Sequence, residues 1–259
     1  MSDNRFAALS WENDDIETIE HFRFDDVDAR QPLYRNFEEF VYRHPQLLTS
    51  GTNTTLVADL DPMVEIPLIG EEEARQLLNY GWDTDEETHR WIISSQPHSG
   101  IMAATLVEKP LLRFLERSFF PLPVVPAILP FIDKWTASEK ILSATEPKLD
   151  VYIDNYGDNF YFGFFKDGKL LMTPVYKRAA DPLNIIFFIK ETIKVLSPEG
   201  CVRLHADTGN EALRQFVEAL GESYEIVESV FQSKSSFKTY IWDSVEVIEP
   251  VKAAILFTL

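Results

Sequence analysis

The sequence predicts a mixed α/β (α+β) protein made of two halves, with mixed sheets flanked by helices. Three observations predict this class. Segments of alternating or continuous apolar residues, typical of strands, are interleaved with segments whose apolar residues recur at helical spacing. Each half of the chain begins with strands and continues with alternating helices and strands. The 259 residues, 45% hydrophobic and 25% charged, are sufficient for two cores of ordinary size.

The first half is expected to open with a β-hairpin, after which helices and strands alternate. Pro45 marks the end of the first helix, and Pro110 occupies the first helical position of the third, where its missing N–H costs nothing. Glutamates at 71–73 complement the dipole at the start of the second helix. The expected elements are a hairpin over 5–24, a helix over 33–44, strands over 55–67 broken at Pro62, a helix over 71–81, strands over 89–96 and 100–109, and a helix over 110–120.

A proline-rich junction is predicted between the halves, at 121–148. It contains four prolines at 121–130 and a polar tail, which mark a boundary between regular elements, while its apolar residues argue against a loose linker. We place the boundary near residue 145. The predicted domains are therefore 1–145 and 146–259.

The second half is expected to begin with three antiparallel strands. Val151 and Ile153 share one side of the first, aromatic residues fill the second at 160–165, and the turn Lys166-Asp167-Gly168 leads into the third. A long core helix over 181–197 follows, then a strand over 201–207, a helix over 211–221 and strands over 224–230, 237–243 and 252–259. The wide apolar stripe of the long helix consists of Leu183, Ile186, Phe187, Ile189, Ile193 and Leu196.

The charge of the chain limits its partners. Forty-two acidic residues against 24 basic ones give a net charge of −18, which repels nucleic acid and anionic lipid surfaces. The chain shows no basic and apolar signal segment, and no apolar stretch long enough to span a bilayer as a helix. The single cysteine, Cys201, falls in a strand-like apolar run and is expected to be buried. We expect an acidic cytoplasmic protein that binds no nucleic acid and does not insert into membranes.

The order of three strands, helix, strand and helix resembles the ribonuclease-H-like fold, and its duplication resembles the actin-like ATPases. Residues 151–171 resemble the second phosphate-binding element of that superfamily, with Asp154 in the place of the aspartate that faces phosphate or metal-bound water. Residues 202–220 are similar to the elements that hold adenosine. The chain as a whole resembles an uncharacterised bacterial family of domains of unknown function, found mainly in Bacteroidetes, for which an actin-like fold is implied.

This resemblance implies two functions, depending on whether nucleotide is still bound. One is a divergent ATPase that binds ATP and magnesium in the interdomain cleft. In it, Asp154 or Asp158 would order a magnesium-bound water. The residues that would contact nucleotide are Asn155, Gly157, Asp207, Thr208, Gly209 and Asn210.

The other implied function is a protein-interaction or scaffold module with a degenerate site, an unidentified protein partner and no cofactor. Phosphate-binding turns need glycines so that backbone N–H groups approach the phosphates. Here Tyr156 stands where the first glycine is expected and Asp158 adds repulsion, while Ala206 and Asp207 replace the glycine pair of the adenosine region. The acidic segment 10–18, which matches the first phosphate element, has no glycine. These departures favour the non-catalytic module.

Three further features have competing interpretations. His205 and Asp207 share a strand face and form either an acid–base or metal pair or, more simply, satisfied polar groups. The acidic residues of segment 83–89 either collect a divalent ion or form a solvated turn, and the missing calcium-loop glycine favours the turn. The aromatic run at 160–165 is either a docking surface or, as we favour, a strand buried on both faces.

Overall fold

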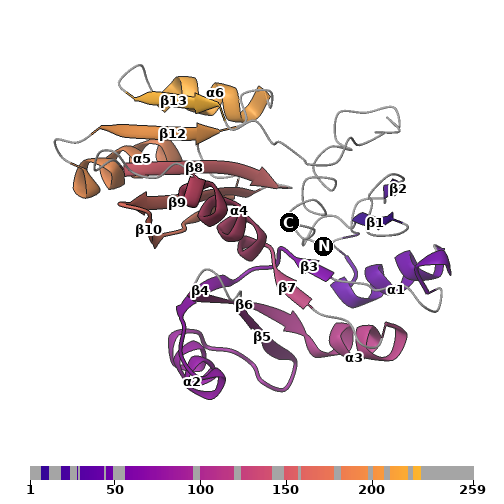
Figure 1. Ribbon diagram of the computed structural model, residues 1–259. Coiled ribbons are helices and arrows are strands. Elements are labelled where there is room, and N and C mark those ends of the chain that lie inside the picture. The colour runs from indigo at the N-terminus through magenta and orange to yellow at the C-terminus, as the bar shows by residue number, and fades with distance from the viewer. Residues whose placement is uncertain are drawn as a thin grey trace. The chain divides into compact units, whose positions relative to one another are not determined.

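The structure is a computed structural model of the 259-residue chain (Figure 1). It describes residues 7–11, 19–23, 28, 30–43, 45–48, 56–95, 100–119, 124–141, 149–156, 159–177, 182–197, 201–206, 211–220 and 224–228. These residues divide into two compact units, one containing those of 7–11 and 19–129 and the other those of 130–228. The sequence predicted two halves with the same order of strands and helices, divided near residue 145. That duplication and its boundary stay predictions.

The described part of the first unit contains short sheets and amphipathic helices. Its elements are β1 (Ala7–Trp11), β2 (Ile19–Arg23), α1 (Leu33–Arg43), the 3₁₀ turn η1 (Pro45–Leu48), β3 (Leu56–Ala58), β4 (Met63–Pro67), α2 (Glu71–Gly81), β5 (His89–Ser95), β6 (Ile101–Glu108), α3 (Lys109–Ser118) and β7 (Val124–Pro126). Strands β1 and β2 pair antiparallel, which confirms the predicted hairpin. Strand β6 lies between β4 and β5, and β3 pairs parallel with β7.

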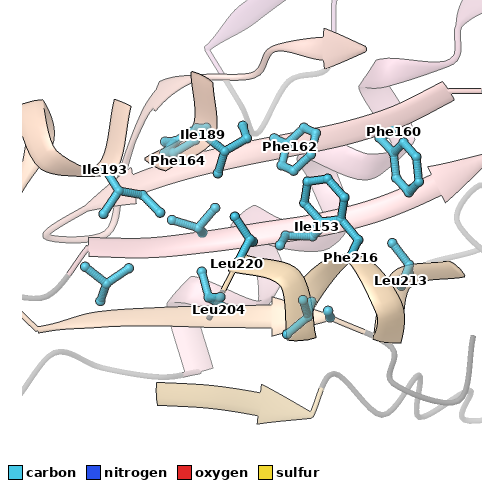
Figure 2. Close-up of a cluster of buried hydrophobic side chains, with 14 of the residues drawn as sticks. Ile153, Phe160, Phe162, Phe164, Ile189, Ile193, Leu204, Leu213, Phe216 and Leu220 are labelled. Carbon is cyan, nitrogen blue, oxygen red and sulfur yellow. The ribbon is translucent and has the colours of Figure 1, made fainter. Parts of the chain in front are cut away.

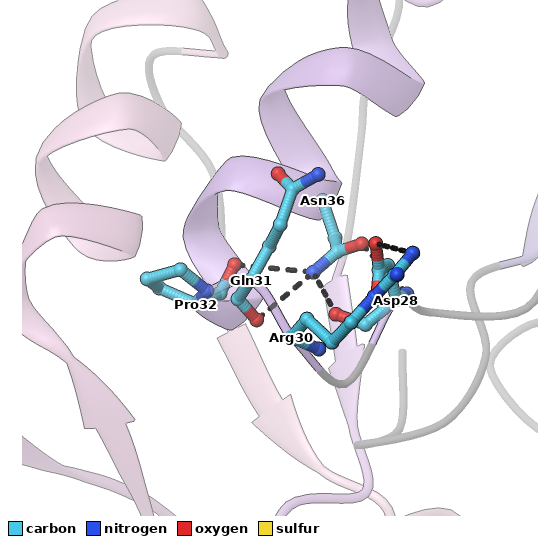
Figure 3. Close-up of polar contacts among 5 residues, drawn as sticks. All are labelled: Asp28, Arg30, Gln31, Pro32 and Asn36. Atoms are coloured by element: carbon cyan, nitrogen blue, oxygen red, sulfur yellow. Dashed lines mark hydrogen bonds and ion pairs between the residues drawn. The ribbon is translucent and has the colours of Figure 1, made fainter.

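The start of α1 is fixed by Asn36, whose amide turns back to the preceding loop (Figure 3). Its Nδ2 group donates to the backbone carbonyls of Asp28, Gln31 and Pro32, each at 3.2 Å, and its Oδ1 accepts from the Asp28 N–H at 2.9 Å. These bonds tie the loop that contains Asp28 and Gln31 to the first turn of the helix.

Two apolar clusters hold the first unit together. In one, Phe37, Phe40 and Val41 of α1 pack with residues of α3 such as Leu111 and Phe114. These three α1 residues recur at helical spacing, so one side of the helix faces the core. In the other, Ala74 and Leu78 of α2 pack against Trp91 of β5 and residues of β4 and β6.

The second unit is built on a six-stranded mixed sheet. Its elements are α4 (Ile128–Ile141), β8 (Leu149–Tyr156), β9 (Asn159–Lys166), β10 (Lys169–Met172), β11 (Val175–Lys177), α5 (Pro182–Leu196), β12 (Val202–Ala206), α6 (Glu211–Leu220) and β13 (Glu225–Glu228). The strand order is β10-β9-β8-β12-β13, with β11 also paired to β9. Strands β8, β9 and β10 are antiparallel neighbours, and β12 runs parallel to β8 and β13, as the ribonuclease-H-like order predicts.

The two faces of this sheet are covered by different helices. Helices α5 and α6 cover one face, where Ile189 and Phe216 meet Ile153 and Phe162 of the strands (Figure 2). Helix α4 contacts the other face, where Phe131 stacks on Tyr161 with ring centroids 4.6 Å apart. The aromatic strand β9 is therefore buried on both faces, which confirms that interpretation of the run at 160–165.

Two expectations from the sequence were wrong, and one helix was not expected. The junction predicted at 121–148 contains the helix α4, in which Pro130 falls in the first turn, where proline is tolerated. Cys201 is exposed rather than buried, because it precedes β12 instead of lying within it. The face of α5 turned to the core carries Ile185, Ile189 and Ile193, while Leu183 and Phe187 are exposed.

Among the residues that the structure describes, no helix is long and apolar enough to cross a membrane.

Candidate functional site

Asp154, the predicted phosphate-facing residue, lies near the end of β8 on the sheet face that contacts α4. Its side chain is 8% exposed, and the neighbouring Asn155 is also buried. The other predicted site residues lie outside the described part of the chain: Gly157, Asp158, Asp207, Thr208, Gly209 and Asn210. Of the predicted site residues, Asp154 and Asn155 lie within the described part of the chain.

The carboxylate of Asp154 accepts three hydrogen bonds from α4. The Lys134 ammonium lies 2.8 Å from Oδ1 and 2.9 Å from Oδ2, and the Trp135 indole N–H donates to Oδ2 at 2.8 Å. The Lys134 side chain is 14% exposed and Trp135 is fully buried. The charge of Asp154 is therefore neutralised by a largely buried ion pair within the second unit.

A glycine in the neighbouring strand makes room for Trp135. A Cβ atom at Gly163 would lie 2.4 Å from Cε3 of the indole, far inside van der Waals contact. The ring also stacks on Phe131 and on Tyr152, with centroids 5.9 and 6.1 Å away. Close contact between α4 and the sheet thus places the indole N–H beside Asp154.

These contacts do not fit a magnesium-binding role for Asp154. Magnesium is held by carboxylate oxygens together with water and phosphate. Both oxygens of Asp154 already accept from Lys134, so a metal ion bound directly to this carboxylate would have to displace the ammonium. The displaced cation would lose its carboxylate partner in a largely buried place, which costs several kcal/mol, of order 3.

A second polar cluster lies on the same sheet face, toward the start of β8. Arg203 donates from Nε to Oδ1 of Asp150 at 2.5 Å and from Nη2 to Oδ2 at 2.6 Å. His205 Nε2 lies 2.6 Å from the same Oδ1, and it is the donor because an ionised carboxylate only accepts. Burial raises the pKa of Asp150, but the bonds from His205 and Arg203 outweigh it and leave this pKa below its ordinary value.

Tyr152 extends the cluster to α4. Its hydroxyl donates to Oε1 of Glu139 at 2.8 Å, and its ring stacks on His205 at 4.3 Å. Burial raises the pKa of Glu139 above its ordinary value, although the bond from Tyr152 opposes this. His205 is therefore a satisfied, buried polar group, the simpler of its two interpretations, although its bonded partner is Asp150, which the sequence had not singled out.

One metal-like arrangement appears among the described residues. Ligand atoms of Glu139, Asp150 and His205 all lie within 4.8 Å of one another. The guanidinium of Arg203, however, bridges both oxygens of Asp150 and repels a cation at that point. The acidic segment 83–89 is exposed, and Asp85 caps its turn by accepting from the Glu87 N–H and the Thr88 hydroxyl.

Sequence reasoning did not identify the partners of Asp154. Lys134 and Trp135 lie in the segment that was interpreted as a junction, so no helix was expected to bring them to the sheet. Asp150, Tyr152 and Asp154 alternate along β8, and Arg203 and His205 alternate along β12. This period of two places all five on one face, and it is the signal that identifies the cluster.

Comparisons with solved structures show the fold. A protein from Bacteroides thetaiotaomicron VPI-5482, described as having an actin-like ATPase fold and unknown function, matches with a TM-score of 0.64 and 16% identity, over 81% of this chain and 82% of that one. A weaker match, with a TM-score of 0.47 and 12% identity over 98% and 93% of the two chains, is to the PilM-PilN type IV pilus biogenesis complex. No curated protein matches significantly.

The chain has the actin-like ATPase fold, as its sheet order and the Bacteroides structure both show. The model of one family, described as a protein of unknown function, DUF3822, matches residues 2–208. Because that match spans most of the 259 residues, the chain belongs to the DUF3822 family.

Proposed function

We propose that this chain is a non-catalytic member of the actin-like fold that acts as a protein-interaction or scaffold module. The observation that carries the proposal is the state of Asp154, whose two carboxylate oxygens accept hydrogen bonds from Lys134 and Trp135. A residue that faces phosphate-bound metal in an ATPase here anchors α4 to the sheet.

The sequence around this anchor supports the same proposal. Tyr156 stands where the first glycine would be needed and Asp158 adds negative charge, so bulk and repulsion oppose a triphosphate at that turn. A second largely buried ion pair, between Arg203 and Asp150, lies on the same sheet face and stabilises its packing. Both ion pairs support a sheet face whose polar groups stabilise the packing and do not bind a ligand.

A titration with ATP and magnesium tests the proposal. A ligand that binds only the native state raises the thermal midpoint, by an amount set by its concentration relative to Kd. We expect no rise in the midpoint at millimolar ATP and magnesium. Magnesium chloride alone and ATP with EDTA are the controls for ionic effects on stability.

A rise that requires ATP and magnesium together would overturn the proposal and support the divergent ATPase. In that case the Asp154→Asn variant should abolish the rise, because the aspartate would then be contacting the metal or its water. If the midpoint stays constant in the wild type, the ATPase interpretation is excluded at the concentrations used.

A further inference from the structure

Exposed apolar side chains are concentrated in two places along the described part of the sequence. Twelve large hydrophobic residues are exposed among those that the structure describes. Four of them fall within 68–82 and six within 171–195. Single exposed apolar residues are normal on soluble proteins, but contiguous groups mark interaction sites. The two places belong to different compact units.

The first place is the outer side of α2, here named the α2 face. Leu77 and Tyr80 lie one turn apart and are both exposed, and Tyr80, on the side turned away from the buried Ala74 and Leu78, is 94% exposed. Exposed Glu72 and Glu73 open the same helix. Residues 68–88 contain seven acidic residues and one basic residue, a net charge of −6.

The second place is the outer side of α5, here named the α5 face. Leu183, Phe187, Phe188 and Val195 are all more than half exposed, and the rings of Phe187 and Phe188 contact each other edge to face at 5.7 Å. The opposite side of the helix carries the core residues Ile185, Ile189 and Ile193. Helix α5 is therefore apolar on its outer side as well as on the side packed in the core, whereas an amphipathic surface helix needs only the core side to be apolar.

The α5 face is basic in an acidic chain. Residues 166–196 contain six basic and three acidic residues, a net charge of +3, whereas the whole chain carries −18. Lys194 is exposed beside Val195, although it also pairs with Glu191. Lys166 joins the basic hairpin turn to the helix by donating to the Leu196 carbonyl at 2.8 Å.

We propose that the α2 face of one copy of this chain binds the α5 face of a second copy. Both faces are apolar, and their surroundings carry opposite charge, so contact buries apolar surface and pairs acidic with basic groups. Two α5 faces brought together would instead set like charges against each other. Because the two faces differ, the contact is heterologous and leaves a free face on each end. This inference rests on the proposed interaction role and names one partner, a second copy of the chain.

Two variants block one face each and leave the other intact. The α2-face variant is Leu77→Ser with Tyr80→Ser, and the α5-face variant is Phe187→Ser with Phe188→Ser. All four side chains are at least half exposed, so the fold is expected to survive, as circular dichroism would confirm. Leu48→Ser is the matched control, because Leu48 is an exposed apolar residue outside both faces.

Sedimentation velocity over a concentration series gives the test. For the wild type and the control, we expect the average mass to rise with concentration. Each blocked variant should associate at least about tenfold more weakly, as for loss of central apolar contacts in an interface. An equimolar mixture of the two variants should associate again and stop at a dimer, because one retains the α5 face and the other retains the α2 face.

Three results would overturn the proposal: a wild type that remains monomeric throughout, an α2-face variant that associates as well as the wild type, or a mixture that does not associate. The second result would indicate pairing of two α5 faces. None of these results bears on the ATP titration, so failure of this inference and failure of the proposed function are distinguishable.

Discussion

Lys134 and Asp154 form a largely buried ion pair whose contribution to stability depends on both members being present. Each charge lost its hydration when the side chain was buried, and the partner charge compensates for that loss. Removing one member leaves the other with an uncompensated cost. Removing both leaves only polar or apolar groups of similar size, which costs much less.

We therefore predict that Lys134→Met and Asp154→Asn each lower the free energy of unfolding by about 3 kcal/mol, while the double variant lies within about 1 kcal/mol of the wild type. Asparagine at 154 retains an oxygen that accepts from the Trp135 N–H. Urea unfolding followed by circular dichroism measures all three. Lys169→Met, at the exposed first residue of β10, is the control and should change stability by less than about 0.5 kcal/mol.

The pattern across the variants distinguishes a structural anchor from a ligand-binding residue. If the two single losses simply add in the double variant, the side chains act independently and the anchor interpretation fails. If Asp154→Asn is as stable as the wild type, the carboxylate is held for a purpose other than packing, and the ATPase alternative gains support.

At the scale of elements, the contact between α4 and strand β9 depends on a glycine. Gly163 lies in the middle of an aromatic strand, where a residue without a side chain is unfavourable for packing. Its position beneath the indole of Trp135 explains it, because any Cβ there meets the ring. The helix approaches the sheet as closely as it does because this one side chain is missing.

Gly163→Ala should therefore destabilise the protein, by about 1 to 3 kcal/mol, through overpacking against Trp135. The penalty should shrink when Trp135 is replaced by leucine, which leaves space for the new methyl group. Thermal unfolding of the single and double variants measures this coupling. An equal penalty in both backgrounds would contradict the proposed clash. Gly168→Ala is an unsuitable control, because Gly168 has a φ of 72°.

Most elements could be predicted from the sequence because their signals are local. Helices α1, α2 and α3 follow from apolar spacing and from charged or proline starts, and the β8 to β10 meander follows from alternation and the turn at Asp167 and Gly168, both of which have positive φ. Helix α4 was missed because the four prolines at 121–130 indicated a break. The orientation of α5 was wrong because that helix is apolar on nearly every side, so periodicity alone did not distinguish its core face.

The ion-pair partners at the candidate site could not be predicted from the local sequence pattern. Asp154 and Lys134 are 20 residues apart, and Asp150 and Arg203 are 53 apart, so each pair forms only after α4 and β12 join β8. The identity of Tyr156 and Asp158, where a phosphate-binding turn would need a glycine and no added charge, can by contrast be read directly from the sequence.

At the scale of the whole molecule, the net charge of −18 governs long-range encounters. The potential around such a chain repels other polyanions over about one Debye length, about 10 Å at 0.1 M salt. The basic segment 166–196 is a local exception, and six large apolar side chains are exposed in it. That combination favours a protein contact over a phosphate backbone, since nucleic-acid affinity rises with the number of phosphates neutralised.

We accordingly predict no binding to a fluorescent DNA duplex of about 30 base pairs at about 50 mM salt, a condition that favours electrostatic association. Fluorescence anisotropy should stay constant as protein is added. Lys190→Glu with Lys194→Glu should behave in the same way, because those lysines are not phosphate contacts. A rise in anisotropy that disappears in this double variant and falls steeply with salt would show that the α5 face overcomes the net charge, and would reassign that face from a second protein copy to a polyanion.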